Sequence, residues 1–149
     1  MKTIAFTGVD GFTVAGPTFA NQQFDFSFVI DKSDVIIKEI TPVSSCLLVS
    51  VADPSQDVTF DFKTSAKIRT TGIGKLFYSP VVGISSTNEA FLMMNQINKV
   101  DIRLFSGQSI GLVMPWAFHS KYNAGDDFMI VFECGFIVSY EEVDFKMFK

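Results

Sequence analysis

The sequence has few of the residues that catalytic and metal centres usually require. It contains one histidine, His119, and two cysteines, Cys46 and Cys134, in 149 residues. A serine or cysteine nucleophile normally needs a base beside it, so such a centre would depend on His119, a carboxylate or a lysine. One histidine and two cysteines also cannot fill the four positions of a zinc site without carboxylates. We therefore expect no catalytic residue, no metal and no cofactor, and we expect His119 to lie in a loop or on the surface.

Complete motifs for nucleotide or sugar chemistry are missing as well. Gly74-Lys75 resembles the end of a phosphate-binding loop, but Leu76 follows where serine or threonine is needed. The pairs Asp126-Asp127 and Glu141-Glu142 are each adjacent in sequence. Adjacent residues of a strand point to opposite faces, so neither pair suits glycoside hydrolysis. Glu133 is expected to be half exposed or paired with a basic residue of a neighbouring strand. We expect that the protein is not an enzyme.

Long apolar runs and an excess of basic residues are absent too. No apolar stretch reaches the roughly 18 residues of a membrane-spanning helix. The N-terminal segment breaks at Gly8, Asp10 and Gly11, which leaves no room for the apolar region of a signal peptide. Acidic residues outnumber basic ones by 16 to 12, whereas nucleic-acid binders usually carry a basic excess. We expect synthesis in a cytosol, no membrane span and no nucleic-acid partner.

The charged residues are unevenly distributed along the chain. Positions 62–88 contain bases but no acid, and positions 126–144 contain acids but no base. The bases are Lys63, Lys67, Arg69 and Lys75, and the acids are Asp126, Asp127, Glu133, Glu141, Glu142 and Asp144. One interpretation is solvated surface on different strands. The alternative is a basic patch and an acidic patch that meet between neighbouring copies of the chain.

Both cysteines lie within apolar stretches of the sequence. Free buried thiols are the normal state in a reducing compartment, and this is our expectation for Cys46 and Cys134. A single disulfide remains the alternative if both side chains face the same core.

What the sequence has in abundance is phenylalanine at alternating positions. There are 17 phenylalanines and 48% of the residues are apolar, which is too hydrophobic for a disordered chain. In the stretch 128–140 (FMIVFECGFIVSY) every even position is apolar or aromatic, whereas the odd positions are mixed. Because side chains of a strand alternate between its two faces, this pattern predicts one long strand with a continuous core face. Gly135 in its centre allows a bulge or bend.

The rest of the chain alternates between short strand-like runs and turn residues. Strands are predicted at 3–7, 12–15, 24–30, 35–40, 46–51, 58–62, 67–71, 76–78, 100–104, 110–114 and 143–147. The segment from Gly8 to Gly11 predicts a turn, and Pro42 and Pro115 predict strand ends. Residues 116–127 form the longest predicted connection.

One segment is predicted to be helical. Ser86 to Glu89 fits a capping box, and residues 90–96 (AFLMMNQ) are good helix formers. The alternative is a further strand at 91–94. About ten strands with at most one short helix indicate a single domain over residues 1–149. We predict an all-β, jelly-roll-like sandwich of two antiparallel sheets.

Trp116, Phe118 and Tyr122 fall together in the predicted connection. Exposed aromatic rings can stack on sugars, so these residues are candidates for contact with a glycan or a protein partner. The alternative is that they cover one end of the sandwich or contact a neighbouring subunit.

Four strand-like segments carry a resemblance to a known class of proteins. They are FDFSFVI (24–30), VTFDF (58–62), VDIRLF (100–105) and FMIVFECGFIVSY (128–140). Their pattern resembles the single jelly-roll proteins of virus particles, such as capsid, vertex (penton) or tail-associated subunits. The resemblance implies a non-enzymatic virion subunit that self-assembles into rings or shells with copies of itself and other virion proteins. The alternative function is a carbohydrate- or protein-binding module, and the third is an enzyme with an unrecognised site.

Overall fold

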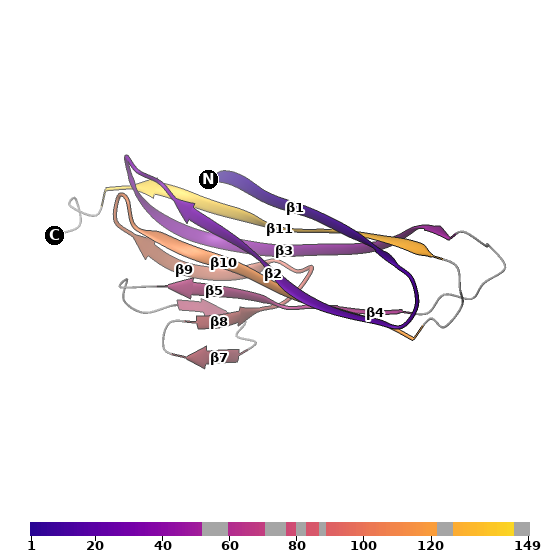
Figure 1. The fold of residues 1–149 in the computed structure, drawn as a ribbon. Coiled ribbons are helices and arrows are strands. Elements are labelled where there is room, and N and C mark those ends of the chain that lie inside the picture. The colour runs from indigo at the N-terminus through magenta and orange to yellow at the C-terminus, as the bar shows by residue number, and fades with distance from the viewer. Residues whose placement is uncertain (52–59, 71–76, 80–82, 87–88, 122–126, 145–149) are drawn as a thin grey trace.

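The computed structural model describes residues 1–51, 60–70, 77–79, 83–86, 89–121 and 127–144 as a set of strands (Figure 1). They are β1 (Lys2–Val14), β2 (Thr18–Val29), β3 (Asp34–Val51), β4 (Phe60–Thr64), β5 (Ala66–Thr70), β6 (Phe77–Ser79), β7 (Gly83–Ser86), β8 (Glu89–Leu92), β9 (Asn98–Leu104), β10 (Ser109–Ser120) and β11 (Phe128–Val143). The residues in these ranges contain no helix, and the strands form two antiparallel sheets. The predicted all-β sandwich is therefore confirmed.

The two sheets have the strand order of a jelly roll. Sheet A has the order β1-β11-β3-β9-β6, and sheet B has the order β2-β10-β5-β8-β7, with β4 also paired to β10. The first strand pairs with the last, and each following pair lies further inward along the chain. These antiparallel pairs are β1–β11, β2–β10, β3–β9 and β5–β8. Successive pairs alternate between the two sheets, which is the wrapping of a jelly roll. The short strands β6 and β7 extend the sheets beyond β9 and β8.

The sandwich has a narrow end and a broad end (Figure 1). At the narrow end, β1, β11 and β3 of sheet A face β2, β10 and β4 of sheet B. At the broad end, β9 and β6 widen sheet A, and β5, β8 and β7 widen sheet B. The long strands β1, β2, β3, β10 and β11 run through both ends, so the two halves share one core.

Strand β11 lies at the centre of sheet A and carries the core face that the sequence predicts. All even positions from Phe128 to Tyr140 are buried. The pairing of β11 with β3 has no bulge at Gly135, since its irregularities lie at Met129/Ile130 and Ser139/Tyr140. A Cβ atom at position 135 would instead overlap the carbonyl oxygen of Phe6 on β1. Glycine is needed here because β1 approaches β11 closely.

The composition of the core changes along the sandwich. At the narrow end, the rings of Phe12, Phe24, Phe62 and Trp116 surround Phe132, with ring centroids 4.5 to 6.4 Å apart. At the broad end most of the fully buried side chains are aliphatic: Ile37, Ile40, Ile68, Ile102, Leu104, Ile110 and Leu112. Bulky rings fill the space between the sheets where fewer strands contribute side chains.

Pro42 and Pro115 lie inside strands rather than at strand ends, which corrects the sequence prediction. The carbonyl of Pro115 accepts a 3.2 Å hydrogen bond from Ser65 N, between β4 and β5, and Pro42 O accepts one of 2.7 Å from Asn95 N. The N–H and C=O groups of a strand residue point to the same side of the strand. On the side where each proline lacks an N–H, the neighbouring strand has already ended, so no strand hydrogen bond is lost. The predicted connection at 116–127 consequently begins as strand, because β10 continues to Ser120.

Strand β1 is not interrupted by the predicted turn from Gly8 to Gly11. Every residue of that segment is in register with a residue of β11. The backbone N–H of Gly11 also donates a 2.8 Å hydrogen bond to the side chain of Asp10. Long-range pairing with β11 therefore prevails over the local turn preference of glycine and aspartate.

The predicted helix at 90–96 is also wrong, and the strand alternative lies closer to the structure. Residues 89–92 form β8, and a turn then leads into β9, with Asn95 at a φ of 57°. The fully buried side chain of Asn98 holds this turn. Its amide donates hydrogen bonds to the carbonyls of Ile40, Met93 and Gln96, and its oxygen accepts one from Met93 N. These bonds replace the capping interactions that the sequence suggests for a helix.

The two cysteines are free, as expected. Cys46 is opposite Phe132 and Cys134 is opposite Ser44, so the cysteines are diagonal neighbours on the core faces of β3 and β11. Diagonal neighbours have Cα atoms roughly 7–8 Å apart, beyond the usual reach of a disulfide. Burial raises the pKa of both thiols, that of Cys134 to about 11. Both side chains therefore act as small apolar residues of the core, with Cys134 buried and Cys46 half-buried.

Candidate interaction surfaces

The aromatic residues predicted to contact a glycan or a partner lie in the core. Trp116 is 5% exposed and Phe118 is fully buried, because both continue the core-facing positions of β10. Tyr122 lies outside the described residues. A buried ring cannot stack on a ligand, so the structure removes Trp116 and Phe118 from the candidate contact surface. The alternative, that these rings cover one end of the sandwich, agrees with their position at the narrow end.

The predicted basic patch lies on the outer face of sheet B and is partly neutralised within the chain. Lys63 is on β4, and Lys67 and Arg69 are on β5. Glu89 of β8 accepts a 2.7 Å hydrogen bond from Arg69 Nε and lies 4.0 Å from Lys67 Nζ. Lys75 lies outside the described residues. Among the described residues of this set, Lys63 is the one that is exposed and has no ion-pair partner.

The predicted acidic residues do not form one patch. Asp127 precedes β11, whereas Glu141 and Glu142 lie near the end of the same strand, roughly 45 Å away at about 3.3 Å per residue. Asp126 lies outside the described residues. Glu142 is 3.0 Å from Lys2 Nζ of β1, and its hydrogen bond and charge raise the pKa of that lysine. These positions give no support to one acidic surface that meets the basic residues of another copy.

Glu133 and His119 are both exposed side chains of central strands. Glu133 lies on the outer face of sheet A, opposite Val9 and Ser45 instead of a basic residue. His119 lies at the end of β10 and not in a loop, and its ring centroid is 6.4 Å from that of Phe19. The ranges that the structure describes contain no cluster of three or more histidine, cysteine, aspartate or glutamate side chains placed to hold a metal ion. They also contain no helix long and apolar enough to cross a membrane.

A group of apolar side chains is exposed on the outer face of sheet A. We call it the apolar face, and it consists of Val9 (61% exposed), Leu47 (65%), Val49 (50%), Met129 (40%) and Ile137 (40%). These residues come from β1, β3 and β11, and most of them lie at the narrow end. Monomeric proteins seldom expose large contiguous apolar patches, and such patches commonly mark contact sites. In the sequence this surface was indicated only by the odd positions of residues 128–140, where apolar and polar residues are mixed without a clear pattern.

An open groove of about 550 Å³ crosses the outer face of sheet B at the narrow end. Pro115 and Ala117 of β10 form its floor, and Asn21 and Gln23 of β2 line one side. Lys63 and Ser65 line the other side. The groove exists because two short side chains of the central strand lie between longer side chains of its neighbours. We call this surface the polar groove.

Comparison with known proteins gives matches among the solved structures but none among family models or curated proteins. A solved chain from "Structure of infectious bursal disease virus Gx strain" matches with 9% sequence identity and a TM-score of 0.21. The match covers 95% of this chain and 38% of that chain. A TM-score of this size carries no argument, so the jelly-roll assignment rests on the strand pairing alone.

Proposed function

We propose that this protein is a non-enzymatic structural subunit that self-assembles, as a capsid, vertex or tail component of a virus particle. The observation that carries the proposal is the apolar face of sheet A. Its five exposed apolar side chains come from three adjacent strands, and the exposed polar residues paired beside them include Glu133, Ser45 and Thr13. Burial of such a surface against another subunit is favourable because it removes apolar area from water.

A second copy of the chain suits this face better than a charged partner does. The face is almost uncharged, so it offers a partner little electrostatic complementarity. An apolar patch can pack against the same patch of a second copy across a two-fold axis. The jelly roll is shared by viral capsid and lectin domains, which supports the virion role by analogy of fold alone. In this proposal the protein is made in a cytosol and its partners are its own copies and other virion proteins.

The proposal is tested by size-exclusion chromatography with light scattering over a range of protein concentrations. We expect the purified protein to form an oligomer whose mass rises with concentration. Leu47→Glu should shift it toward monomer, because it places a charge at the most exposed position of the apolar face.

Ser27→Glu is the matched control, since Ser27 is exposed and the substitution adds the same charge to the outer face of the other sheet. It should leave the oligomer unchanged. A protein that is monomeric at all concentrations, alone and mixed with its native particle proteins, would contradict the proposal. Equal disruption by both variants would contradict the assignment of the contact to sheet A.

A further inference from the structure

We infer that the polar groove on sheet B binds a neutral carbohydrate. The inference is independent of self-assembly, because the groove and the apolar face lie on opposite outer faces of the sandwich. Its residues differ from the aromatic set that the sequence suggested, and they come together only through the pairing of β2, β10 and β4.

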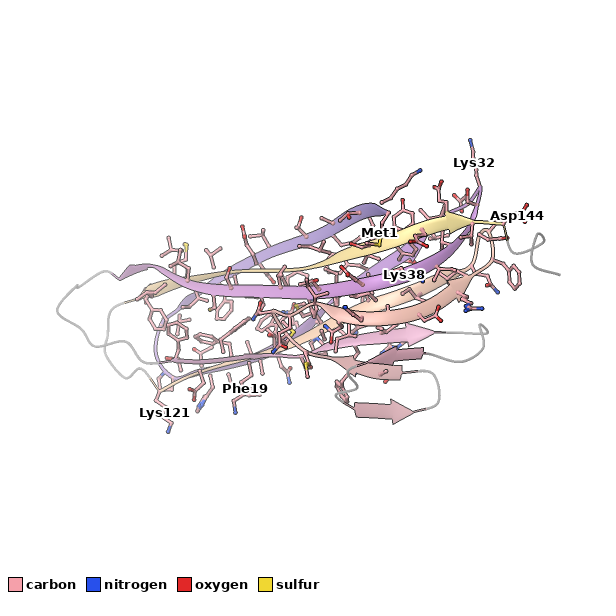
Figure 2. The ribbon with its side chains drawn as sticks, turned by 180° about the vertical axis from the view of Figure 1, so that it is seen from behind. Met1, Phe19, Lys32, Lys38, Lys121 and Asp144 are labelled. Atoms are coloured by element: carbon pink, nitrogen blue, oxygen red, sulfur yellow. The ribbon has the colours of Figure 1, made fainter. Side chains whose placement is uncertain are left out.

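The register of these strands arranges the outward-facing side chains in rows. In one row Ala117 of β10 lies between Asn21 of β2 and Lys63 of β4. In the next row, toward the tip of the narrow end, His119 lies between Phe19 and Asp61. Both rows face solvent on the outer side of sheet B, where Figure 2 places Phe19 at the narrow end, near Lys121. Together with the row at Pro115, the surface is about 13 Å long, which suits a short oligosaccharide.

The polar groups that line the groove match the hydroxyl groups of a sugar. Asn21 offers both a donor and an acceptor, and its side chain has no hydrogen-bond partner among the described residues. Gln23 Nε2 donates to both carboxylate oxygens of Asp25, at 3.2 and 3.1 Å, which fixes the amide and leaves its oxygen as an acceptor. Lys63 supplies further donors on the opposite side. A sugar hydroxyl is both donor and acceptor, so amides on one side and an ammonium on the other can bind several hydroxyls at once.

Phe19 provides the apolar part of the site. Its side chain is 68% exposed, and its ring lies 6.4 Å from the His119 ring in the row of residues next to those that line the groove. An exposed phenyl ring beside hydrogen-bonding groups suits a ligand with one apolar face and a polar rim, which describes a pyranose ring.

The charge around the groove favours a neutral ligand over an acidic one. Lys63 is balanced by Asp61, two residues away on the same outer face of β4, and Asp25 lies beside Gln23. A polyanion would need a net excess of basic side chains, which this surface does not have.

The test is a glycan array that carries both neutral and sialylated or sulfated glycans, followed by calorimetric titration of the strongest neutral ligand. We expect neutral glycans to bind. Phe19→Ala and Asn21→Ala should each weaken binding about tenfold, which corresponds to the loss of one ring contact or hydrogen-bonded group. Ala117→Trp should abolish binding because it fills the groove from its floor.

Ser27→Trp is the control for Ala117→Trp. Ser27 is exposed on the same outer face of sheet B, opposite Gly111 and outside the groove, so this variant should bind as the wild type does. Circular dichroism establishes that each variant is folded. Absence of binding to any neutral glycan, or binding that survives Ala117→Trp, would overturn the inference. Loss of the oligomer in Ala117→Trp, with no glycan bound by the wild type, would assign the groove to a protein contact instead.

Discussion

The narrow and broad ends of the sandwich are built from the same long strands, but different kinds of side chain fill their cores. The broad end has five strands in each sheet and buries mostly isoleucine, leucine and valine. The narrow end has three strands in each sheet and packs rings of phenylalanine and tryptophan around Phe132. Phenylalanine buries more area per residue than the aliphatic side chains, so it lets a narrow sandwich enclose a core.

The two ends also differ in the surfaces that they expose. The polar groove lies at the narrow end, and so does most of the apolar face. At that end each sheet has only three strands, with β11 or β10 in the centre, and the outer faces of both sheets carry interaction candidates. The broad end supplies the wide sheets that hold the long strands in register. We therefore expect substitutions in the shared long strands to affect the narrow end most.

The largest effect is expected for Gly135→Ala. The new Cβ would overlap the carbonyl oxygen of Phe6 and push β1 away from β11, the strand to which β1 is hydrogen-bonded in sheet A. Because β1 also brings Phe12 into the aromatic cluster, we expect a loss of about 3 kcal/mol in the free energy of unfolding, the upper end of the usual cost of overpacking. Urea denaturation followed by tryptophan fluorescence measures this change.

Gly111→Ala is the matched control in the central strand of the other sheet. A Cβ atom there would meet Arg69 at 3.5 Å, which is ordinary van der Waals contact. This variant should change stability by no more than about 0.5 kcal/mol. Similar losses of stability in both variants would mean that β1 can move away from β11 at little cost. The close approach of β1 would then not explain why position 135 needs glycine.

The second prediction compares one substitution at the two ends. Phe132 has four ring neighbours at the narrow end, whereas Phe28 has Tyr140 as its ring neighbour among the described residues, at 5.2 Å. Both phenylalanines are buried. Phe132→Leu should therefore cost about 2–3 kcal/mol and Phe28→Leu about 1 kcal/mol, since each aromatic pair adds to the energy of burial.

Thermal and urea unfolding of both variants give the comparison directly. Equal costs would mean that the rings at the narrow end contribute only their buried area, and that the aromatic cluster has no special part in closing the narrow sandwich.

The alternation of apolar residues was sufficient to predict the sandwich but not the extent of its strands. The even positions of residues 128–140 predicted the core face of β11 correctly. In β10 the same alternation continues from Met114 to Trp116 and Phe118, yet Pro115 suggested a strand end and so placed both rings in a connection. A proline removes a hydrogen-bond donor on only one side of a strand. Whether it ends the strand therefore depends on whether a neighbouring strand lies on that side. That information is not local in the sequence.

The two candidate surfaces were beyond prediction for the same reason. Asn21, Ala117 and Lys63 are distant in the sequence and become neighbours only when the register of three strands is known. Likewise Leu47 lies beside Val131 because β3 pairs with β11. Periodicity indicates which face of a strand a residue occupies, but it does not indicate which strand lies next to it.

The smallest effect at neutral pH concerns Cys134, whose ionisation changes stability only in alkaline solution. Burial, with a further contribution from nearby Cys46, raises the pKa of this thiol from 9.0 to about 11. Between these values the unfolded chain loses the proton while the folded protein keeps it, so stability should fall as the pH rises from about 9 to about 11 and should not change on this account at lower pH. Unfolding at several pH values measures the slope, and Cys134→Val should reduce it because valine cannot ionise. An identical slope in this variant would mean that water reaches the thiol, and that the core between the aromatic and the aliphatic ends is not dry.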